Sequence, residues 1–202
     1  MEQETGLFPP PLCKGDTIAV ISPAFRPNAL LPDHLARGQQ FLIDQGYQVR
    51  IIYTPIDDLD FGAQVQQRCD EIHEAFRDPA VTAIICTVGG AESHELLPML
   101  DYPLIRSNPK IFVGFSDITS LHCGIFTQTG LRTFYGPMVI DPFGGSGTPN
   151  SFTIKAFFDV VTASGQQAGG PLPIAAECDV VTGVFDDPPE SDVASTMKPN
   201  PG

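Results

Sequence analysis

The first 140 residues alternate short apolar segments with segments of helical periodicity, and this alternation limits the fold more than any other feature. Strand-like runs and helical patterns follow one another along the chain. We predict strands at 17–22, 48–53, 83–88, 110–114 and 131–135, and helices at 31–45, 63–77, 93–100 and 117–129. Strands joined through helices form right-handed crossovers within a parallel sheet. The sequence therefore predicts an α/β fold: a doubly wound, mainly parallel sheet of Rossmann or flavodoxin-like type, with helices on both faces.

The composition changes after this region. Gly and Pro become frequent from Pro142 onward, and one further helix is predicted at 152–161. We expect an N-terminal domain at 1–145, a partial helix with a Gly/Pro-rich segment at 146–185, and a disordered, irregular tail at 186–202.

Charge excludes several classes of partner. The chain has 11 basic and 24 acidic residues and a net charge of -13. Nucleic-acid binding and polybasic membrane contacts both need clustered Lys and Arg, so we expect neither nucleic acid nor membrane as a partner. The acidic start of the chain has no apolar signal segment, and the five cysteines are widely spaced without a C-x-x-C pair. These features favour a cytoplasmic protein with reduced thiols and no metal site.

Ser116 is the first candidate for chemistry. It lies where a predicted strand ends and a helix begins, with Gly114 two residues before it. Such a turn exposes a side chain at the sheet edge, beside backbone N–H groups that can stabilise an oxyanion. The hydrolase pattern G-x-S-x-G has a second glycine where this chain has Ile118. The alternative is that Ser116 or Asp117 only caps the helix.

A nucleophilic serine needs a base, and the four histidines offer no obvious one. His122 follows Ser116 by six residues on the same predicted helix and should face away from it. His34 and His73 lie on other predicted helices and are expected to be exposed. His94 follows the glycine loop after the third strand and can lie near Ser116 as a substrate-binding residue, or it is a solvated loop histidine.

Gly89 and Gly90 follow the third predicted strand. Their backbone N–H groups can bind a carbonyl oxygen or a phosphate, although a tight turn needs the same residues. The chain has neither G-x-G-x-x-G nor a Walker motif. A flavodoxin-like domain that binds phosphate at this loop remains a weaker alternative.

Several ordered stretches resemble the LD-carboxypeptidase family of serine peptidases, which includes the microcin C self-immunity proteins. Residues 108–119 read NPKIFVGFSDIT and look like the nucleophile signature of that family. The other stretches are 11–23 (PLCKGDTIAVISP), 68–79 (RCDEIHEAFRDP), 87–90 (TVGG) with 96–97, and 129–137 with its YGP end.

The resemblance implies roles for individual residues. Ser116 would be the nucleophile, and the backbone N–H groups of Asp117 and Gly90 would form the oxyanion hole. The Asp117 side chain would brace the turn. Gly89, Gly90 and His94 would contact substrate, which is a small peptide or a peptidyl or aminoacyl-adenylate-like compound cleaved at an amide next to a free carboxylate. The resemblance implies no metal or organic cofactor, and a homodimer is possible.

One departure from the family pattern affects the activity. In this family a Glu and a His come from a C-terminal domain that opens with a G-G-N-L stretch, and nothing after Asp141 resembles it. We therefore expect a nucleophile domain whose C-terminal catalytic domain is missing and whose triad is incomplete. The alternative is a binding or vestigial module that folds without turnover.

Overall fold

The computed structural model describes residues 6–147, 149–162, 174, 177–178 and 198–199. A five-stranded sheet forms its centre, with every neighbouring pair parallel and the strand order β2-β1-β3-β4-β5. The strands are β1 (Thr17–Ile21), β2 (Gln48–Ile51), β3 (Val81–Cys86), β4 (Ile111–Gly114) and β5 (Phe134–Tyr135). This is the order of flavodoxin-like sheets, and it confirms the predicted doubly wound α/β fold.

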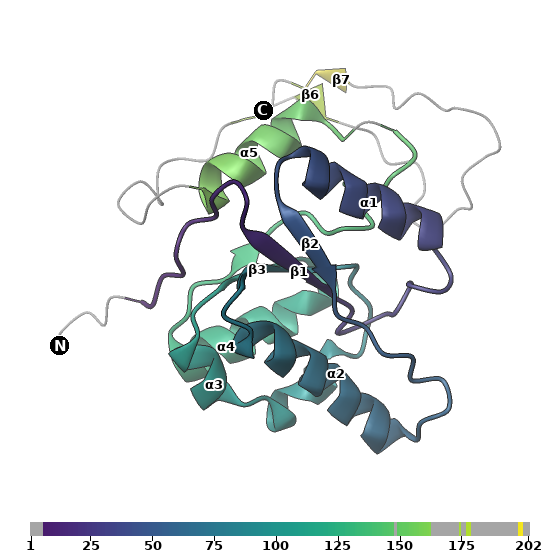
Figure 1. Cartoon of the computed structure of the whole chain (residues 1–202), viewed down its shortest axis with the longest axis vertical. Coiled ribbons are helices and arrows are strands. Elements are labelled where there is room, and N and C mark those ends of the chain that lie inside the picture. Colours follow the sequence, from purple (N-terminus) through teal and green to yellow (C-terminus); the bar gives the residue numbers. More distant parts are fainter. Residues whose placement is uncertain (1–5, 148, 163–173, 175–176, 179–197, 200–202) are drawn as a thin grey trace. The chain divides into compact units, whose positions relative to one another are not determined.

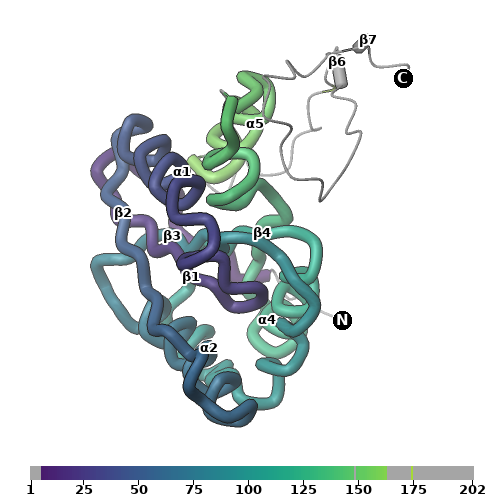
Figure 2. Tube along the Cα trace, turned by 90° about the vertical axis from the view of Figure 1, so that its right-hand side faces the viewer, coloured from purple at the N-terminus to yellow at the C-terminus, as the bar shows by residue number. Residues whose placement is uncertain are grey.

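Helices cover both faces of the sheet (Figure 1). They are α1 (Pro32–Asp44), α2 (Phe61–Arg77), η1 (Ser93–Met99), α3 (Tyr102–Ser107), η2 (Ser116–Ile118), α4 (Thr119–Thr129) and α5 (Ser151–Val161). Helices α1 and α5 lie on one face, and α2, α3 and α4 lie on the other, as Figure 2 also shows for α1, α5 and α2.

Alternate residues of the strands divide the core into two clusters. In β3, Ile84 and Cys86 pack with residues of α2 and α4, whereas Ala83 and Ile85 pack with residues of α1 and α5. This alternation follows from the two-residue period of a strand. Because both faces are covered, the central strands are largely apolar, with Thr17 in β1 and Thr82 in β3 as exceptions.

The strand predicted at 131–135 is present only at Phe134–Tyr135, and the helix predicted at 117–129 is divided into η2 and α4. Two further differences have a clear physical reason. Helix α3 was not predicted, because it is only six residues long; it begins at Asp101, whose carboxylate accepts a hydrogen bond from the Leu104 N–H. The predicted helix at 93–100 is a 3-10 helix, and it contains Pro98. Proline has no N–H to donate within a helix, which disfavours a regular α-helix there.

The C-terminal part of the chain is described only at a few positions. Helix α5 agrees with the predicted helix, and its Phe157 and Val161 are buried in the core. By itself, the last part of the chain contains an antiparallel pair, β6 (Glu177–Cys178) with β7 (Lys198–Pro199). The predicted disorder of 186–202 falls outside the described residues, apart from this second strand. Within the described ranges no helix has the length and apolarity needed to cross a bilayer.

The carboxyl ends of the central strands meet at one edge of the sheet. In a flavodoxin-like sheet the crevice for ligands lies at this edge, beside the switch point between β1 and β3. Here the two loops are hydrogen-bonded across that point, since the Phe25 N–H donates to the Gly89 carbonyl oxygen at 3.1 Å. Strand β4 is the next neighbour of β3, so the turn that contains Ser116 lies beside the Gly89 loop.

Candidate active site

Ser116 occupies a strained turn between β4 and the helix that follows. Its φ is +60°, and it is the one non-glycine residue with a positive φ in the described part of the chain. The preceding Phe115 is extended, with φ -144° and ψ -174°. Holding a non-glycine residue in such a conformation costs on the order of 1–3 kcal/mol, and residues of this kind concentrate at functional sites. The Ser116 side chain is exposed to solvent.

The sequence around Ser116 explains how this turn forms. A Cβ added at Gly114 would lie 2.7 Å from Cγ2 of Ile118, so only glycine fits there. Ile118 itself is fully buried in the core. Ile118 stands where the G-x-S-x-G pattern has its second glycine, and its side chain packs against Gly114, which is the first glycine of the pattern. The Thr119 hydroxyl donates to the Ser116 carbonyl oxygen at 2.5 Å and closes the turn.

Gly89 lies directly against Ser116. A Cβ added at Gly89 would be 3.0 Å from Cβ of Ser116, 3.2 Å from its Oγ and 3.4 Å from the Asp117 nitrogen. The glycine loop and the serine turn therefore lie together at this edge of the sheet. Any side chain here would occupy the space in front of the hydroxyl.

Two backbone N–H groups near Ser116 are available to a ligand. The Gly90 N–H donates to no other group among the described residues, and Gly90 is exposed. Asp117 stands in the first turn of a helix, where N–H groups have no partner within the helix. The helix dipole adds partial positive charge at this end, so the position suits a developing negative charge.

The Asp117 side chain holds the glycine loop in place. Its Oδ2 accepts hydrogen bonds from the N–H groups of Glu92, at 3.0 Å, and Ser93, at 2.9 Å. The Ser93 hydroxyl donates in turn to the Asp117 carbonyl oxygen at 2.7 Å. This carboxylate therefore braces the serine turn against the residues that follow the glycine loop.

Tyr135 is a neighbour of Ser116 that the sequence did not single out as a site residue. Its hydroxyl accepts a long hydrogen bond, 3.4 Å, from the Ser116 N–H. The residue is 69% exposed, although its ring lies beside the rings of Phe115 and His122. Tyr135 ends β5, the strand next to β4, and side chains at the ends of neighbouring strands reach the same edge of the sheet.

The histidines do not supply a base to Ser116 in the described part of the chain, where no side chain is hydrogen-bonded to its Oγ. His122 is buried beneath the turn, with Nε2 2.9 Å from the Gly114 carbonyl oxygen. Burial lowers the pKa of His122, and the hydrogen bond to Gly114 opposes this only in part. His94 is exposed and makes no hydrogen bond within the described residues, so its role as a substrate contact stays a prediction.

One histidine prediction is wrong. His73 was expected to be exposed, but it is 9% exposed, and its Nε2 accepts a hydrogen bond from the Asp101 N–H at 2.8 Å. Helix α2 carries it under the unpredicted helix α3, and this contact is invisible in the periodicity of α2 alone. Burial accordingly lowers its pKa.

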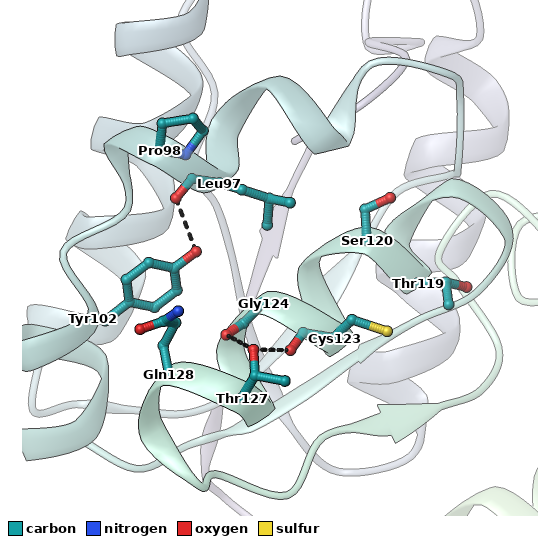
Figure 3. A pocket seen from close by; sticks show the side chains of 9 residues that line it. All are labelled: Leu97, Pro98, Tyr102, Thr119, Ser120, Cys123, Gly124, Thr127 and Gln128. Atoms are coloured by element: carbon teal, nitrogen blue, oxygen red, sulfur yellow. Dashed lines mark hydrogen bonds between the residues drawn. The ribbon is translucent and has the colours of Figure 1, made fainter.

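A separate groove lies between η1, α3 and α4 (Figure 3). Its volume is about 830 Å³, and Ser116 does not line it. The residues that line it carry no charge: Leu97, Pro98, Tyr102, Thr119, Ser120, Cys123, Gly124, Thr127 and Gln128. Among the described residues, no group of three or more His, Cys, Asp or Glu side chains is placed to hold a metal ion.

Fold and site together define an α/β domain that presents an exposed serine on a strained strand-to-helix turn. Comparison with known families identifies which domain this is. Residues 18–136 match the family model described as the LD-carboxypeptidase N-terminal domain, and the chain belongs to this family.

Relatives and solved structures agree with this assignment. The chain is 37% identical over 163 residues to the microcin C7 self-immunity protein MccF of Escherichia coli, covering 80% of this chain and 47% of that protein. It is 41% identical over 137 residues to a Bacillus subtilis protein named "Probable murein peptide carboxypeptidase", covering 67% of this chain and 42% of that protein. The chain thus spans about half the length of the curated relatives it matches.

Among solved structures, MccF in complex with aspartyl sulfamoyl adenosine superposes with a TM-score of 0.83 at 29% identity, covering 96% of this chain and 58% of that chain. An MccF-like protein from Bacillus anthracis superposes with a TM-score of 0.70 at 39% identity, covering 78% of this chain and 47% of that chain.

Proposed function

We propose that this chain is the nucleophile-bearing part of a serine-type carboxypeptidase that forms an acyl-enzyme on Ser116. The observation that carries the proposal is the exposed serine at φ +60°, with Gly89 against its Oγ. A side chain that only capped the helix would not need this strained conformation or a glycine in front of it. A solved active-site mutant of MccF, in which a serine is replaced by alanine together with two other residues, supports a serine-based reaction in the family.

In the proposed reaction the Ser116 Oγ attacks the carbonyl carbon of an amide next to a free carboxylate. The carbonyl oxygen becomes an oxyanion, which accepts hydrogen bonds from the N–H groups of Gly90 and Asp117. The C–N bond then breaks, the amine leaves with a proton, and water hydrolyses the ester on Ser116. The scheme uses no cofactor.

The proton of Ser116 needs an acceptor, which the described residues do not place at its Oγ. We propose that a glutamate and a histidine from outside the described residues, in a further domain like that of the family, complete the triad. Without them the chain would bind substrate but turn it over poorly. The binding-module alternative rests on this same observation.

The substrate class follows from the relatives. MccF has been solved with aspartyl sulfamoyl adenosine and with glutamyl sulfamoyl guanosine, and another relative is named for murein peptides. We propose that this chain takes small compounds of the same kind, either a peptidyl or aminoacyl-adenylate-like molecule or a short peptide with a free carboxylate.

The test is to mix the purified chain with aspartyl sulfamoyl adenosine and, separately, with a murein tetrapeptide that ends in D-alanine. Mass spectrometry would follow the released amine and any acyl group on Ser116, with Ser116→Ala as the control. Release that Ser116→Ala abolishes supports the proposed enzyme. Binding by calorimetry with neither release nor an acyl group on Ser116 supports the binding module, and release that survives Ser116→Ala overturns the role of Ser116. Analytical ultracentrifugation of the same sample tests the expected homodimer.

A further inference from the structure

Arg68 of helix α2 is a buried cation that holds the loop beside Ser116. Its side chain is 1% exposed, and its Nη2 donates to Oε2 of Glu95 at 3.1 Å. Its Nη1 is 3.4 Å from Oε2 of Glu92. Both glutamates lie beyond the glycine loop, and they are more exposed than the arginine, at 63% for Glu92 and 24% for Glu95.

A buried charge of this kind needs an explanation. Removing a guanidinium from water costs several kcal/mol, and an apolar side chain of similar volume often stabilises a core as well or better. Arg68 is more fully buried than its two partners, so the ion pairs are only partly shielded from solvent and contribute less than a fully buried network would. Stability alone therefore does not account for an arginine at this position.

The contacts of Glu92 link Arg68 to the serine turn. The Glu92 side chain pairs with Arg68, while its own N–H donates to the Asp117 carboxylate at 3.0 Å. Asp117 follows Ser116 directly in the chain. Glu92, which follows the glycine loop, is thus held by the Arg68 guanidinium through its side chain and by the Asp117 carboxylate through its backbone N–H.

Arg68 also contacts the loop that follows β1, which packs against Gly89 and Gly90. Its Nη1 is 3.4 Å from the carbonyl oxygen of Pro23. Two residues further on, the Phe25 N–H donates to the Gly89 carbonyl oxygen at 3.1 Å. A Cβ added at Gly90 would lie 2.6 Å from the Phe25 nitrogen, so the backbone of Gly90 packs closely on this segment. The Arg68 guanidinium therefore contacts both the segment on which Gly90 packs, at Pro23, and the segment that follows Gly90 in the chain, at Glu92.

We infer that Arg68 is a positioning residue for the chemistry at Ser116, an inference that rests on the proposed function. Its guanidinium holds the segment from Gly89 to Ser93 in the position in which Gly89 lies directly against Ser116. Arg68 does not touch the reacting atoms. Its planar fork contacts Glu92, Glu95 and Pro23 at once, which a lysine ammonium with one charged atom cannot reproduce.

The experiment compares Arg68→Met and Arg68→Lys with the unaltered 202-residue chain. The matched control is Arg77→Met, on the same helix but exposed and without an ion pair among the described residues. The first readout is the rate at which a fluorophosphonate modifies Ser116, where an Oγ–P bond forms, fluoride leaves and the hydroxyl proton goes to solvent. The second readout is amide hydrogen exchange at Glu92 and Ser93, which requires no activity. Urea unfolding identifies the conditions in which every variant is folded.

We expect Arg68→Met to slow the modification of Ser116 between about 10-fold and about 100-fold, since a displacement on the order of 1 Å has effects of this size. Exchange at Glu92 and Ser93 should accelerate, Arg68→Lys should recover part of both effects, and Arg77→Met should match the unaltered chain. Arg68→Met that is folded and retains both the unaltered rate and the unaltered exchange overturns the inference.

Two further outcomes separate this inference from the proposed function. If the unaltered chain is not modified at Ser116, its own residues do not activate the serine without the further domain that the proposed function invokes, and exchange at Glu92 and Ser93 alone decides whether Arg68 holds the loop. If Arg68→Met does not fold, Glu92→Gln replaces it, because that side chain is largely exposed and tolerates substitution. Glu92→Gln should then produce a smaller loss in rate and a smaller gain in exchange, and no change in either overturns the inference.

Discussion

Gly89 and Ser116 approach so closely that a methyl group on Gly89 would lie 3.2 Å from the serine Oγ and 3.0 Å from its Cβ. The two residues follow neighbouring parallel strands, β3 and β4, and meet where both strands end. This contact leaves the hydroxyl accessible only because residue 89 has no side chain.

Gly89→Ala should therefore impair the site more than the fold. The added methyl must displace Ser116 by a few tenths of an ångström and occupy the approach to its Oγ. We expect modification of Ser116 by a fluorophosphonate to slow by at least about 10-fold, while the free energy of unfolding falls by about 1–2 kcal/mol at most.

The matched control is Gly62→Ala in the first turn of α2. An added Cβ there meets only the Asp60 Oδ1, at 3.5 Å. This substitution should leave the rate unchanged and raise the free energy of unfolding by up to about 1 kcal/mol, because alanine favours a helix over glycine. Equal rates for Gly89→Ala and Gly62→Ala would show that residue 89 does not limit access to Ser116.

The close contact between Gly114 and Ile118 leads to a second prediction, which concerns the free energy of unfolding. Gly114→Ala places a Cβ 2.7 Å from Cγ2 of Ile118, and we expect a loss of about 1–3 kcal/mol in the free energy of unfolding. Ile118→Ala alone should cost about 2–5 kcal/mol through the cavity it leaves.

If the clash causes the loss, the double variant Gly114→Ala/Ile118→Ala should be little less stable than Ile118→Ala, since removing Cγ2 relieves it. A double-mutant cycle by urea unfolding measures this coupling. Strictly additive losses would mean that the methyl at residue 114 is unfavourable for a reason other than Ile118.

The sequence predicted the parts of the fold and site that depend on local pattern. The strands could be located because each is a continuous apolar run, and Ser116 could be found because Gly114 and the strand end lie beside it in the chain. The proximity of the Gly89 loop to Ser116 was expected from the family resemblance, which implied an oxyanion hole formed by this loop and the serine turn.

What the sequence could not predict are contacts between distant segments. Arg68 resembles any charged helix residue until the loops around Pro23 and Glu92 are folded against it. The burial of His73 could not be predicted, because the helix that covers it, α3, is too short to be recognised by periodicity. The 3.4 Å contact between Tyr135 and Ser116 likewise depends on strand order, which the sequence does not state.

Cysteine reactivity gives a third prediction. Burial raises the pKa of the Cys69 thiol to about 11 and raises that of Cys86 as well. Cys13 and Cys123 are exposed. Because the thiolate is the reactive form, a maleimide at neutral pH should modify Cys13 and Cys123 in the folded chain and leave Cys69 and Cys86 unmodified.

Peptide mapping by mass spectrometry after a short reaction identifies the modified sites. In concentrated urea, where burial is lost, these four thiols and that of Cys178 should all react at similar rates. Rapid modification of Cys86 in the absence of urea would mean that the C-terminal end of β3 opens in the folded state, contrary to the full burial of this residue.

The buried histidines predict how stability depends on pH. Burial lowers the pKa of His122 and His73 from the ordinary value of 6.5, so the folded chain binds fewer protons at these sites than the unfolded chain. Their contribution is therefore fully present above pH 6.5 and is lost as the pH falls from there toward the lower folded pKa. Each histidine contributes a slope of up to about 1.4 kcal/mol per pH unit to the free energy of unfolding.

Urea unfolding between about pH 7.5 and about pH 5.5 measures this slope within the range where histidine titrates. His122→Gln keeps a side-chain N–H for the Gly114 carbonyl oxygen but cannot be protonated, so it should reduce the slope even if it lowers stability overall. The same substitution at the exposed His94 serves as the control. An equal reduction in both variants would assign the pH dependence to charge in general and not to the burial of His122 beneath the serine turn.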